Sequence, residues 1–375
     1  MTERAPDDAG GRRRIVAFAT KGAGSNDEAR LRALLERFDV DVVPFDRSKK
    51  ARMFVAILRR IWSRRDALVV MEGTGIAGGA ALLLGRLLRR TGYVVGTGDA
   101  VGPFMAARSP WLGGPFGLYE RLLYRCSAGV IAWTPYLVGR ALTFRAPRAI
   151  SAAGWAPYSQ TPEERVESRA RIRRQLDIPA DALVIGIAGS LPWNARVRYC
   201  YGAELVHAIA RVARRDVRIL IVGDGTGRKE LERITTPETA PLVRYTGAVA
   251  QGEVPAYLAA MDVGSLPQSV DALGGVRYTT KLSEYLAAGL PIVTGEIPLA
   301  YDFGDAWLWR LPGFAPWDPR YVDALARFVE TLTPAAVAAK RSAVPSAMPE
   351  FDRARQVARV TAFIDDVLRH RNGSA

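Results

Sequence analysis

The chain has 375 residues, more than one hydrophobic core usually holds and enough for two domains of ordinary size. Apolar residues make up 49% and charged residues 24%, which excludes a disordered chain and predicts a globular one. The formal charge of +14 favours anionic partners, such as nucleic acid, acidic lipid or phosphorylated small molecules, unless it reflects arginine-rich composition alone.

Two features bear on the compartment. Cys126 and Cys200 are too few for a secreted disulfide framework, and the first residues, "MTERAPDDAGGRRR", lack the apolar region of a signal peptide. No apolar run approaches the roughly 20 residues that span a bilayer. We therefore expect a cytoplasmic protein, peripheral on the inner face of the membrane at most, with residues 1–11 as a disordered tail.

In the first half, short apolar runs alternate with helical patterns. The runs are "RIVAFA", "ALVVMEG", "YVVGTGD" and "AGVIAWT". This alternation predicts a parallel sheet with helices on both faces, over residues 12–155. A segment rich in Pro, Gly and Ser, at residues 151–163, reads as the linker that follows.

The second half, residues 156–350, repeats the alternation. Its candidate strands are "ALVIGIAGS", "VRILIVGDG", "LVRYTGAV", "VGSLPQS" and "LPIVTG". A last helix, from about Arg353 to Arg369 within residues 351–375, is placed to reach back to the first domain. Two Rossmann-like domains follow, with ligands expected beyond the carboxyl ends of their strands.

Three blocks between residues 223 and 295 carry a family resemblance. They are "GDG", then "YTGAV…YLAAMDVGSLPQS", then "SEYLAAGLPIVTG". Their order and spacing resemble the C-terminal domain of retaining GT-B glycosyltransferases, close to glycosyltransferase family four, the glycosyl transferases group 1. The resemblance implies an α/β GT-B fold, with two Rossmann-like parallel-sheet domains facing each other across a cleft. It also implies transfer of a sugar from a UDP-, GDP- or dTDP-sugar to an acceptor hydroxyl, with retention of configuration.

By this resemblance, Glu284 is the ribose ligand of the donor. A carboxylate accepts two hydrogen bonds from ribose hydroxyls, and we expect Glu284 in the first turn of a helix that begins near Thr280. The alternative is an acid favoured there only by the helix dipole. Family members commonly carry a second glutamate eight positions earlier, which contacts the sugar, but Val276 stands here. Asp271, Thr279 or the loop backbone are the candidate substitutes, and the identity of the donor sugar is left open.

The donor diphosphate and base need further contacts. Arginine and lysine donate hydrogen bonds to phosphate oxygens, and glycine lets the backbone come close to a phosphate. For each basic candidate, the alternative to phosphate binding is a charged side chain on the solvated surface. The diphosphate candidates are Arg196, Arg198, Lys281, Arg277 and Gly275. The nucleotide candidates are Gly223, Asp224, Gly225, Gly247 and Val249. The "GDG" turn has the alternative of a plain strand-to-helix turn.

The first domain should supply the acceptor site. Gly22 and Gly24 follow its first strand and either approach the donor or acceptor or form a plain turn. An inverting reaction would need Asp99 or Glu72 as its base, although Asp99 can also cap a turn. Retention needs no such base, and no histidine precedes His207 in the chain. We expect no metal and no cofactor, since the two histidines have no ligand spacing.

Residues 50–65 form a basic amphipathic pattern that bears on the acceptor. Its apolar residues, Phe54, Ile57, Leu58, Ile61 and Trp62, share one helical face beside arginines at 59, 60, 64 and 65. Such a helix either covers the sheet or lies on an anionic membrane. The acceptor is unknown, with a lipid-linked molecule or a small natural product as candidates, and no nucleic-acid partner is expected.

Two other functions fit a GT-B chain. A non-catalytic sugar-nucleotide-binding protein would explain the missing glutamate at Val276. A GT-B sugar-nucleotide epimerase would need acid–base residues that the sequence does not offer.

Overall fold

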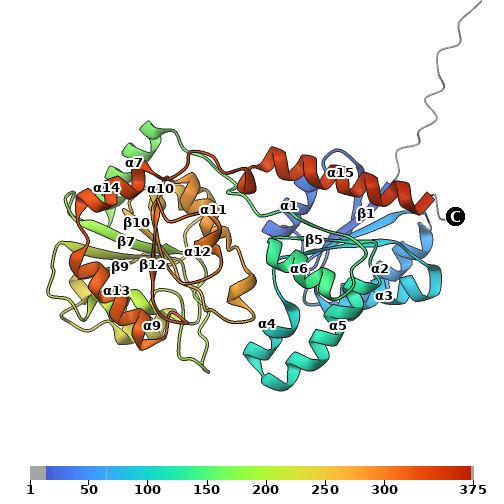
Figure 1. Cartoon of the computed structure of the whole chain (residues 1–375), viewed down its shortest axis with the longest axis horizontal. Helices are drawn as coiled ribbons and strands as arrows, with labels where there is room; N and C mark the ends of the chain where they lie inside the picture. The colour runs from blue at the N-terminus through green and yellow to red at the C-terminus, as the bar shows by residue number, and fades with distance from the viewer. Residues whose placement is uncertain (1–13, 65, 373–375) are drawn as a thin grey trace, which may run out of the picture. The chain divides into compact units, whose positions relative to one another are not determined.

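A computed structural model describes residues 14–64 and 66–372, and the expected tail at residues 1–11 lies outside them. The chain forms two compact units (Figure 1). Unit 1 comprises the residues up to Ala153 together with those from Asp352 onward. Unit 2 runs from Gly154 to Phe351.

Unit 1 is built on a six-stranded parallel sheet in the order β2-β1-β3-β4-β5-β6. The strands are β1 (Arg14–Ala19), β2 (Asp39–Val42), β3 (Leu68–Glu72), β4 (Tyr93–Thr97), β5 (Gly129–Ala132) and β6 (Ala149–Ser151). Every residue of the central strands β3, β4 and β5 is buried, as expected for a parallel sheet covered on both faces.

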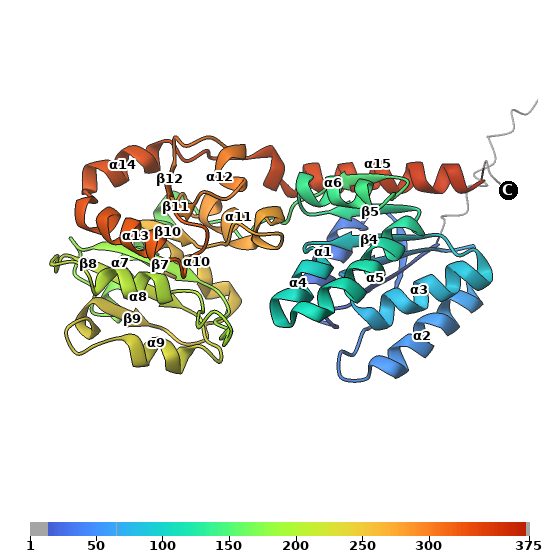
Figure 2. The same cartoon turned by 60° about the horizontal axis from the view of Figure 1, so that its bottom comes forward.

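Helices cover this sheet on both sides. They are α1 (Asn26–Leu34), α2 (Lys50–Ser63), α3 (Ile76–Arg89), α4 (Val101–Arg108), α5 (Gly113–Arg125), α6 (Pro135–Thr143) and the C-terminal α15 (Arg353–Asn372). Figure 2 shows α15 on one side of the sheet and α2 with α3 on the other. Arg353 of α15 pairs with Glu36 after α1, and Phe363 packs where Gly129 lacks a side chain.

Unit 2 repeats the architecture with a second parallel sheet, in the order β12-β11-β10-β7-β8-β9. The strands are β7 (Leu183–Ala188), β8 (Val217–Val222), β9 (Val243–Tyr245), β10 (Val263–Leu266), β11 (Ile292–Gly295) and β12 (Leu308–Leu311). The helices are α7 (Pro162–Gln175), α8 (Ala203–Ile209), α9 (Arg228–Ile234), α10 (Val254–Ala259), α11 (Thr280–Ala287), α12 (Leu299–Asp302), α13 (Pro319–Thr331) and α14 (Pro334–Ser342).

The strand order of each sheet defines one topological switch point. In unit 2 the chain proceeds from β7 outward to β8 and β9, then returns to β10 on the other side of β7. In unit 1 the corresponding point lies between β1 and β3. Loops that leave a sheet at such a point run in opposite directions. Ligands of doubly wound sheets bind between these loops.

The amphipathic helix expected at residues 50–65 is α2, and its apolar face is buried or half-buried in unit 1 except at Trp62, which is exposed. Ile57, Leu58 and Ile61 are buried in the core of unit 1, and Phe54 packs against the same core. The interpretation of α2 as a helix that covers the sheet is therefore the one observed. Within residues 14–64 and 66–372, no helix is long and apolar enough to cross a membrane.

Candidate functional site

The loops after β7 and β10 meet the start of α11 at the switch point of unit 2. Lys281, in the first turn of α11, extends to the loop after β7, where its ammonium lies 4.2 Å from the centre of the Tyr201 ring. Gly189 gives this side chain room, because a Cβ there would lie 3.0 Å from Lys281 Cε and 3.1 Å from Nζ. A cation is thereby held at the switch point by a strand end, an aromatic ring and a glycine.

Glu284 lies one turn further along α11, which corrects the expectation that it occupies the first turn. The helix begins at Thr280, so Glu284 is in the second turn, where the dipole effect has faded. Its carboxylate is half-buried, and no residue in the described part of the chain donates a hydrogen bond to it. Burial raises its pKa to about 6, an effect that the nearby Lys281 opposes. A desolvated carboxylate without donors is the state expected of a ligand-binding group.

Tyr158 is the neighbour of Glu284 that the sequence did not indicate. It lies in the segment expected to be a linker, and its hydroxyl is buried without a hydrogen-bond partner among the described residues. Burial raises the pKa of Tyr158, and the negative charge of Glu284 adds to the rise, which places the two groups close together. A hydroxyl without a partner and a carboxylate without a donor, both judged among the described residues, thus lie near each other in unit 2 with complementary hydrogen-bonding capacity.

The N-terminus of α11 is open to an anion. Thr279 is its N-cap residue but makes no side-chain capping bond, and its buried Oγ1 has no partner among the described residues. The Thr279 carbonyl accepts the N–H of Leu282 at 3.0 Å, but its side chain caps none of the first N–H groups of α11. Such groups, together with the dipole, favour a phosphate at this position.

The loop before α11 uses Asp271 for its own shape. The Asp271 carboxylate accepts the N–H groups of Leu273 at 2.9 Å and Gly274 at 2.7 Å, and Gly275 donates to the Asp271 carbonyl at 2.9 Å. Asp271 is thus engaged in the turn, which weakens it as a substitute for the missing family glutamate. Of the remaining residues of this loop, Val276 and Arg277 are half-buried.

The "GDG" glycines allow two loops to approach each other closely. A Cβ on Gly223 would lie 1.9 Å from the carbonyl oxygen of Gly189, and one on Gly225 would lie 2.5 Å from that of Leu191. Both glycines have positive φ, and Gly225 donates to the Asp224 carboxylate at 2.7 Å. The glycines therefore hold the loop after β7 in place, and through it the site of Lys281.

Two further sets of expected nucleotide contacts line the same edge. Gly247 accepts the N–H of Gly223 at 3.0 Å, and Val249 follows half-buried in the loop after β9. Arg196 and Arg198 are exposed in a turn closed by paired hydrogen bonds between Asn194 and Tyr199. Among the cationic candidates, Lys281 makes a contact at the switch point, with the ring of Tyr201.

A buried acid supports the loop after β7. Glu204 is 1% exposed and accepts hydrogen bonds from the Tyr199 hydroxyl at 2.9 Å, the Gly202 N–H at 3.0 Å and the Ser265 hydroxyl at 3.3 Å. Burial raises its pKa to about 7. Glu204 connects α8 to β10 and anchors the segment that carries Tyr201. The sequence could have indicated Glu204 by its position in the first turn of a helix that follows Gly202.

In unit 1, Glu72 ends β3 beside the switch point, but it is held by an ion pair. Arg30 donates to its Oε1 at 2.8 Å, and the Trp133 indole donates to the same oxygen at 3.1 Å. Burial raises the pKa of Glu72, and the Arg30 charge opposes that rise. Arg30 also donates to the Ala152 carbonyl at 2.6 Å. These hydrogen bonds connect α1 to the ends of β3 and β5, so Glu72 has a structural role.

The other expected residues of unit 1 lie at the same edge. Asp99 follows β4 and is half-buried; Ala100, not Asp99, is the N-cap residue of α4. Gly22 and Gly24 have positive φ, and their N–H groups bond within the turn, to the Ala19 carbonyl and the Glu28 carboxylate. These two amides are therefore not available to a phosphate.

The C-terminal helix brings one histidine to unit 1. Residues 12–155 hold no histidine, as the sequence shows, but α15 adds His370 to unit 1. This helix contacts Arg148, just before β6, through Asp366, so His370 lies toward the amino edge of the sheet, away from Glu72 and Asp99. Among the residues that the structure describes, no cluster of three or more His, Cys, Asp or Glu side chains could hold a metal ion.

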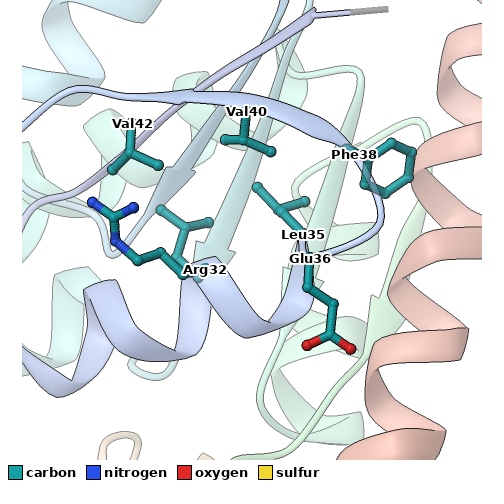
Figure 3. Close-up of a pocket in the computed structure, with 7 residues that line it drawn as sticks. Arg32, Leu35, Glu36, Phe38, Val40 and Val42 are labelled. Atoms are coloured by element: carbon teal, nitrogen blue, oxygen red, sulfur yellow. The ribbon is translucent and has the colours of Figure 1, made fainter. Parts of the chain in front are cut away.

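Unit 1 also contains a cavity, whose lining residues Figure 3 shows. It is formed between the end of α1 and the edge strand β2, and is lined by Leu31, Arg32, Leu35, Glu36, Phe38, Val40 and Val42. None of the expected site residues reaches it.

Comparisons with known proteins agree with this architecture. A family model described as "Glycosyl transferases group 1" matches residues 182–306, from β7 to just past α12. This span contains Lys281, Glu284 and the "GDG" loop. By sequence, no curated protein matches the chain.

Solved structures match over nearly the whole chain. The Anabaena protein Alr3699/HepE, solved with UDP and glucose, is 16% identical with a TM-score of 0.69, covering 93% of this chain and 99% of its own. The sucrose-phosphate synthase of Thermosynechococcus elongatus is 14% identical with a TM-score of 0.66, covering 97% of this chain and 100% of its own. WaaG, a glycosyltransferase involved in lipopolysaccharide biosynthesis, is 16% identical with a TM-score of 0.66, covering 92% and 100%. The fold is therefore that of the GT-B class, as expected.

Proposed function

We propose, from the match of residues 182–306 to glycosyl transferases group 1, that this protein transfers a sugar from a nucleotide-sugar donor to an acceptor hydroxyl. One observation carries the proposal. Glu284 is a desolvated carboxylate without hydrogen-bond donors, one turn from a lysine held at the switch point of the donor-side sheet. Burying such a carboxylate costs stability, which a ligand that donates hydrogen bonds would recover.

In this proposal the donor binds to unit 2 by three groups. The Glu284 carboxylate accepts hydrogen bonds from the ribose hydroxyls. The diphosphate lies against the N-terminus of α11 and the ammonium of Lys281, and these two positive groups stabilise the charge that grows on the leaving diphosphate. Because a protein cation meets this charge, we propose that transfer needs no metal ion.

The reaction proposed is a substitution with retention. The acceptor oxygen forms a bond to the anomeric carbon on the face from which the diphosphate departs, while the bond from that carbon to the phosphate oxygen breaks. The acceptor proton passes to the departing phosphate oxygen, so no protein base is required. The ion pair that engages Glu72 supports this route, because it leaves Glu72 poorly placed to take a proton.

The base and sugar of the donor follow from analogy only. Alr3699/HepE has been solved with UDP-glucose, which makes UDP-sugars the first donors to test here. We propose an acceptor with a free hydroxyl, either lipid-linked or a small natural product.

The test is a binding and turnover panel with UDP-, GDP- and dTDP-sugars. Calorimetric titration should detect one nucleotide that binds the wild type and binds Glu284→Ala at least tenfold more weakly, the scale of a lost hydrogen bond to a charged group. Release of nucleoside diphosphate, with a product of retained configuration identified by NMR, would support transfer. Nucleotide binding without turnover would favour a binding protein, conversion of the free donor sugar would indicate an epimerase, and absence of any nucleotide binding would overturn the proposal.

A further inference from the structure

We infer that a surface at the C-terminal ends of α2 and α3 binds an anionic membrane. The surface, called here the α2/α3 patch, comprises Trp62, Arg86, Leu87, Leu88, Arg89 and Arg90. Leu87 is 78% exposed, Leu88 57% and Trp62 44%. Two adjacent leucines left in water, with arginine on both sides, are unusual for a face that meets only solvent.

Packing between the two helices brings these residues together. Ile61 of α2 fits where Gly85 of α3 lacks a side chain, since a Cβ at Gly85 would lie 3.2 Å from Ile61. Trp62 is the residue after Ile61, and the Arg89 guanidinium of α3 lies 5.9 Å from the centre of its ring. Figure 2 shows the two helices side by side on the same side of the sheet. The aromatic ring of α2 therefore contacts the last turn of α3, and the exposed Leu87 and Leu88 belong to that same turn.

The charge of this surface selects the occupant. Arg86, Arg89 and Arg90 are exposed, and none pairs with a carboxylate in the part of the chain that the structure describes. From residue 50 to residue 90 the sequence has nine basic residues and two acidic ones. Of the two acids, Glu72 is buried, which leaves Asp66, in the loop after α2, as the exposed one.

An anionic bilayer satisfies both components of the α2/α3 patch. Leucine and tryptophan enter the boundary between head groups and acyl chains, while arginine meets lipid phosphate. A nucleic acid would use the arginines and leave the leucines in water. A second copy of the chain would bring the same positive charge against this one, which opposes self-association.

The position of the patch is compatible with a working enzyme. Helix α3 leaves the carboxyl end of β3 and ends just before β4 begins, so the patch lies at the amino edge of the unit 1 sheet. Glu72 and Asp99 lie at the opposite, carboxyl edge. Contact with a membrane through the patch would leave that edge uncovered, although the inference does not depend on the proposed transferase activity.

The test is flotation of the full chain with lipid vesicles. We expect binding to vesicles that contain phosphatidylglycerol in phosphatidylcholine, weak binding to phosphatidylcholine alone, and loss of binding as salt increases. Leu87→Ser/Leu88→Ser, which keeps the charge, should lower the vesicle-bound fraction about tenfold, and Arg86→Gln/Arg89→Gln about as much. Val166→Ser/Arg171→Gln, an exposed apolar and basic pair on α7, serves as the matched control and should bind as the wild type does.

Several outcomes would overturn the inference. They are equal binding of the wild type to both kinds of vesicle, no binding to either, and unchanged binding of the Leu87/Leu88 variant. Without lipid, sedimentation velocity that shows a wild-type dimer and a monomeric Leu87→Ser/Leu88→Ser would assign the patch to a protein interface instead. Binding to duplex DNA that is lost in the arginine variant and kept in the leucine variant would assign it to nucleic acid. Thermal unfolding of each variant verifies that it is folded.

Discussion

The ammonium of Lys281 lies 4.2 Å from the centre of the Tyr201 ring, so α11 and the loop after β7 meet at the switch point of unit 2. The contact joins two loops that leave the sheet in opposite directions. Gly189 provides the space for it. Gly223 lies so close to the Gly189 carbonyl oxygen that a Cβ on Gly223 would be 1.9 Å from it. The position of the cation therefore depends on backbone contacts that only glycine permits.

Removal of this cation should weaken donor binding. We expect Lys281→Ala to lower the affinity for the nucleotide sugar tenfold to a hundredfold, because a hydrogen bond to a charged group contributes about 1.5 to 3 kcal/mol. Lys229→Ala, at an exposed position on α9, is the matched control and should keep wild-type affinity. Titration calorimetry measures both. Equal affinities in the two variants would show that Lys281 does not contact the donor.

Donor binding should depend on pH through Glu284. Its pKa is raised to about 6 in the free protein, so the carboxylate is ionised above pH 6 and protonated below it. Because the ionised form accepts both ribose hydrogen bonds, affinity should fall as pH decreases from 7 to 5. Glu284→Gln should bind more weakly at pH 7 and lose this pH dependence. A wild-type affinity that is constant over this range would argue against a carboxylate contact to ribose.

Stability should depend on pH through Glu204. Its pKa is raised from 4.5 to about 7 in the folded chain, so between these values the folded state binds more protons than the unfolded state. The free energy of unfolding should therefore decrease as pH rises from about 4.5 to 7 and change little above, by up to roughly 3 kcal/mol in all.

Glu204→Gln provides the comparison. Its amide oxygen can accept from Tyr199 and Gly202 while its NH₂ donates to Ser265, so the neutral side chain keeps all three contacts. We expect this variant to unfold with less dependence on pH and to equal or exceed the wild type in stability at pH 8.5. Calorimetry at pH 5 and pH 8.5 measures the difference. Identical pH profiles for the two proteins would contradict the assignment.

Two glycines of neighbouring loops should respond differently to alanine. Gly223→Ala would place a Cβ 1.9 Å from the Gly189 carbonyl, at a φ of +132°, and should cost at least about 3 kcal/mol of unfolding free energy. Gly247→Ala meets open space at a φ of +71° and should cost about 1 kcal/mol. Thermal unfolding of both variants provides the comparison. Equal losses would mean that the backbone approach is not what requires Gly223.

The fold was predictable where strands are central. Each strand expected from an apolar run is present, and the missed ones, β2, β6 and β12, are all edge strands of their sheets. Each is short and contains half-buried positions, so none has the continuous apolar run by which a central parallel strand is recognised. The pattern of residues 50–65 predicted a helix but left open which surroundings its apolar face would have, since a core and a membrane require the same periodicity.

By itself, the sequence determined the α/β architecture and the family resemblance of residues 223 to 295, and it placed Glu284 and Lys281 among the candidate site residues, because apolar periodicity and motif spacing are local properties of the chain. The tertiary structure alone decided what these residues touch. It placed Lys281 on Tyr201, brought Tyr158 near Glu284, and paired Glu72 with Arg30. Such contacts join residues far apart in the chain, and burial and hydrogen bonding depend on the folded neighbourhood, for which sequence spacing carries no signal.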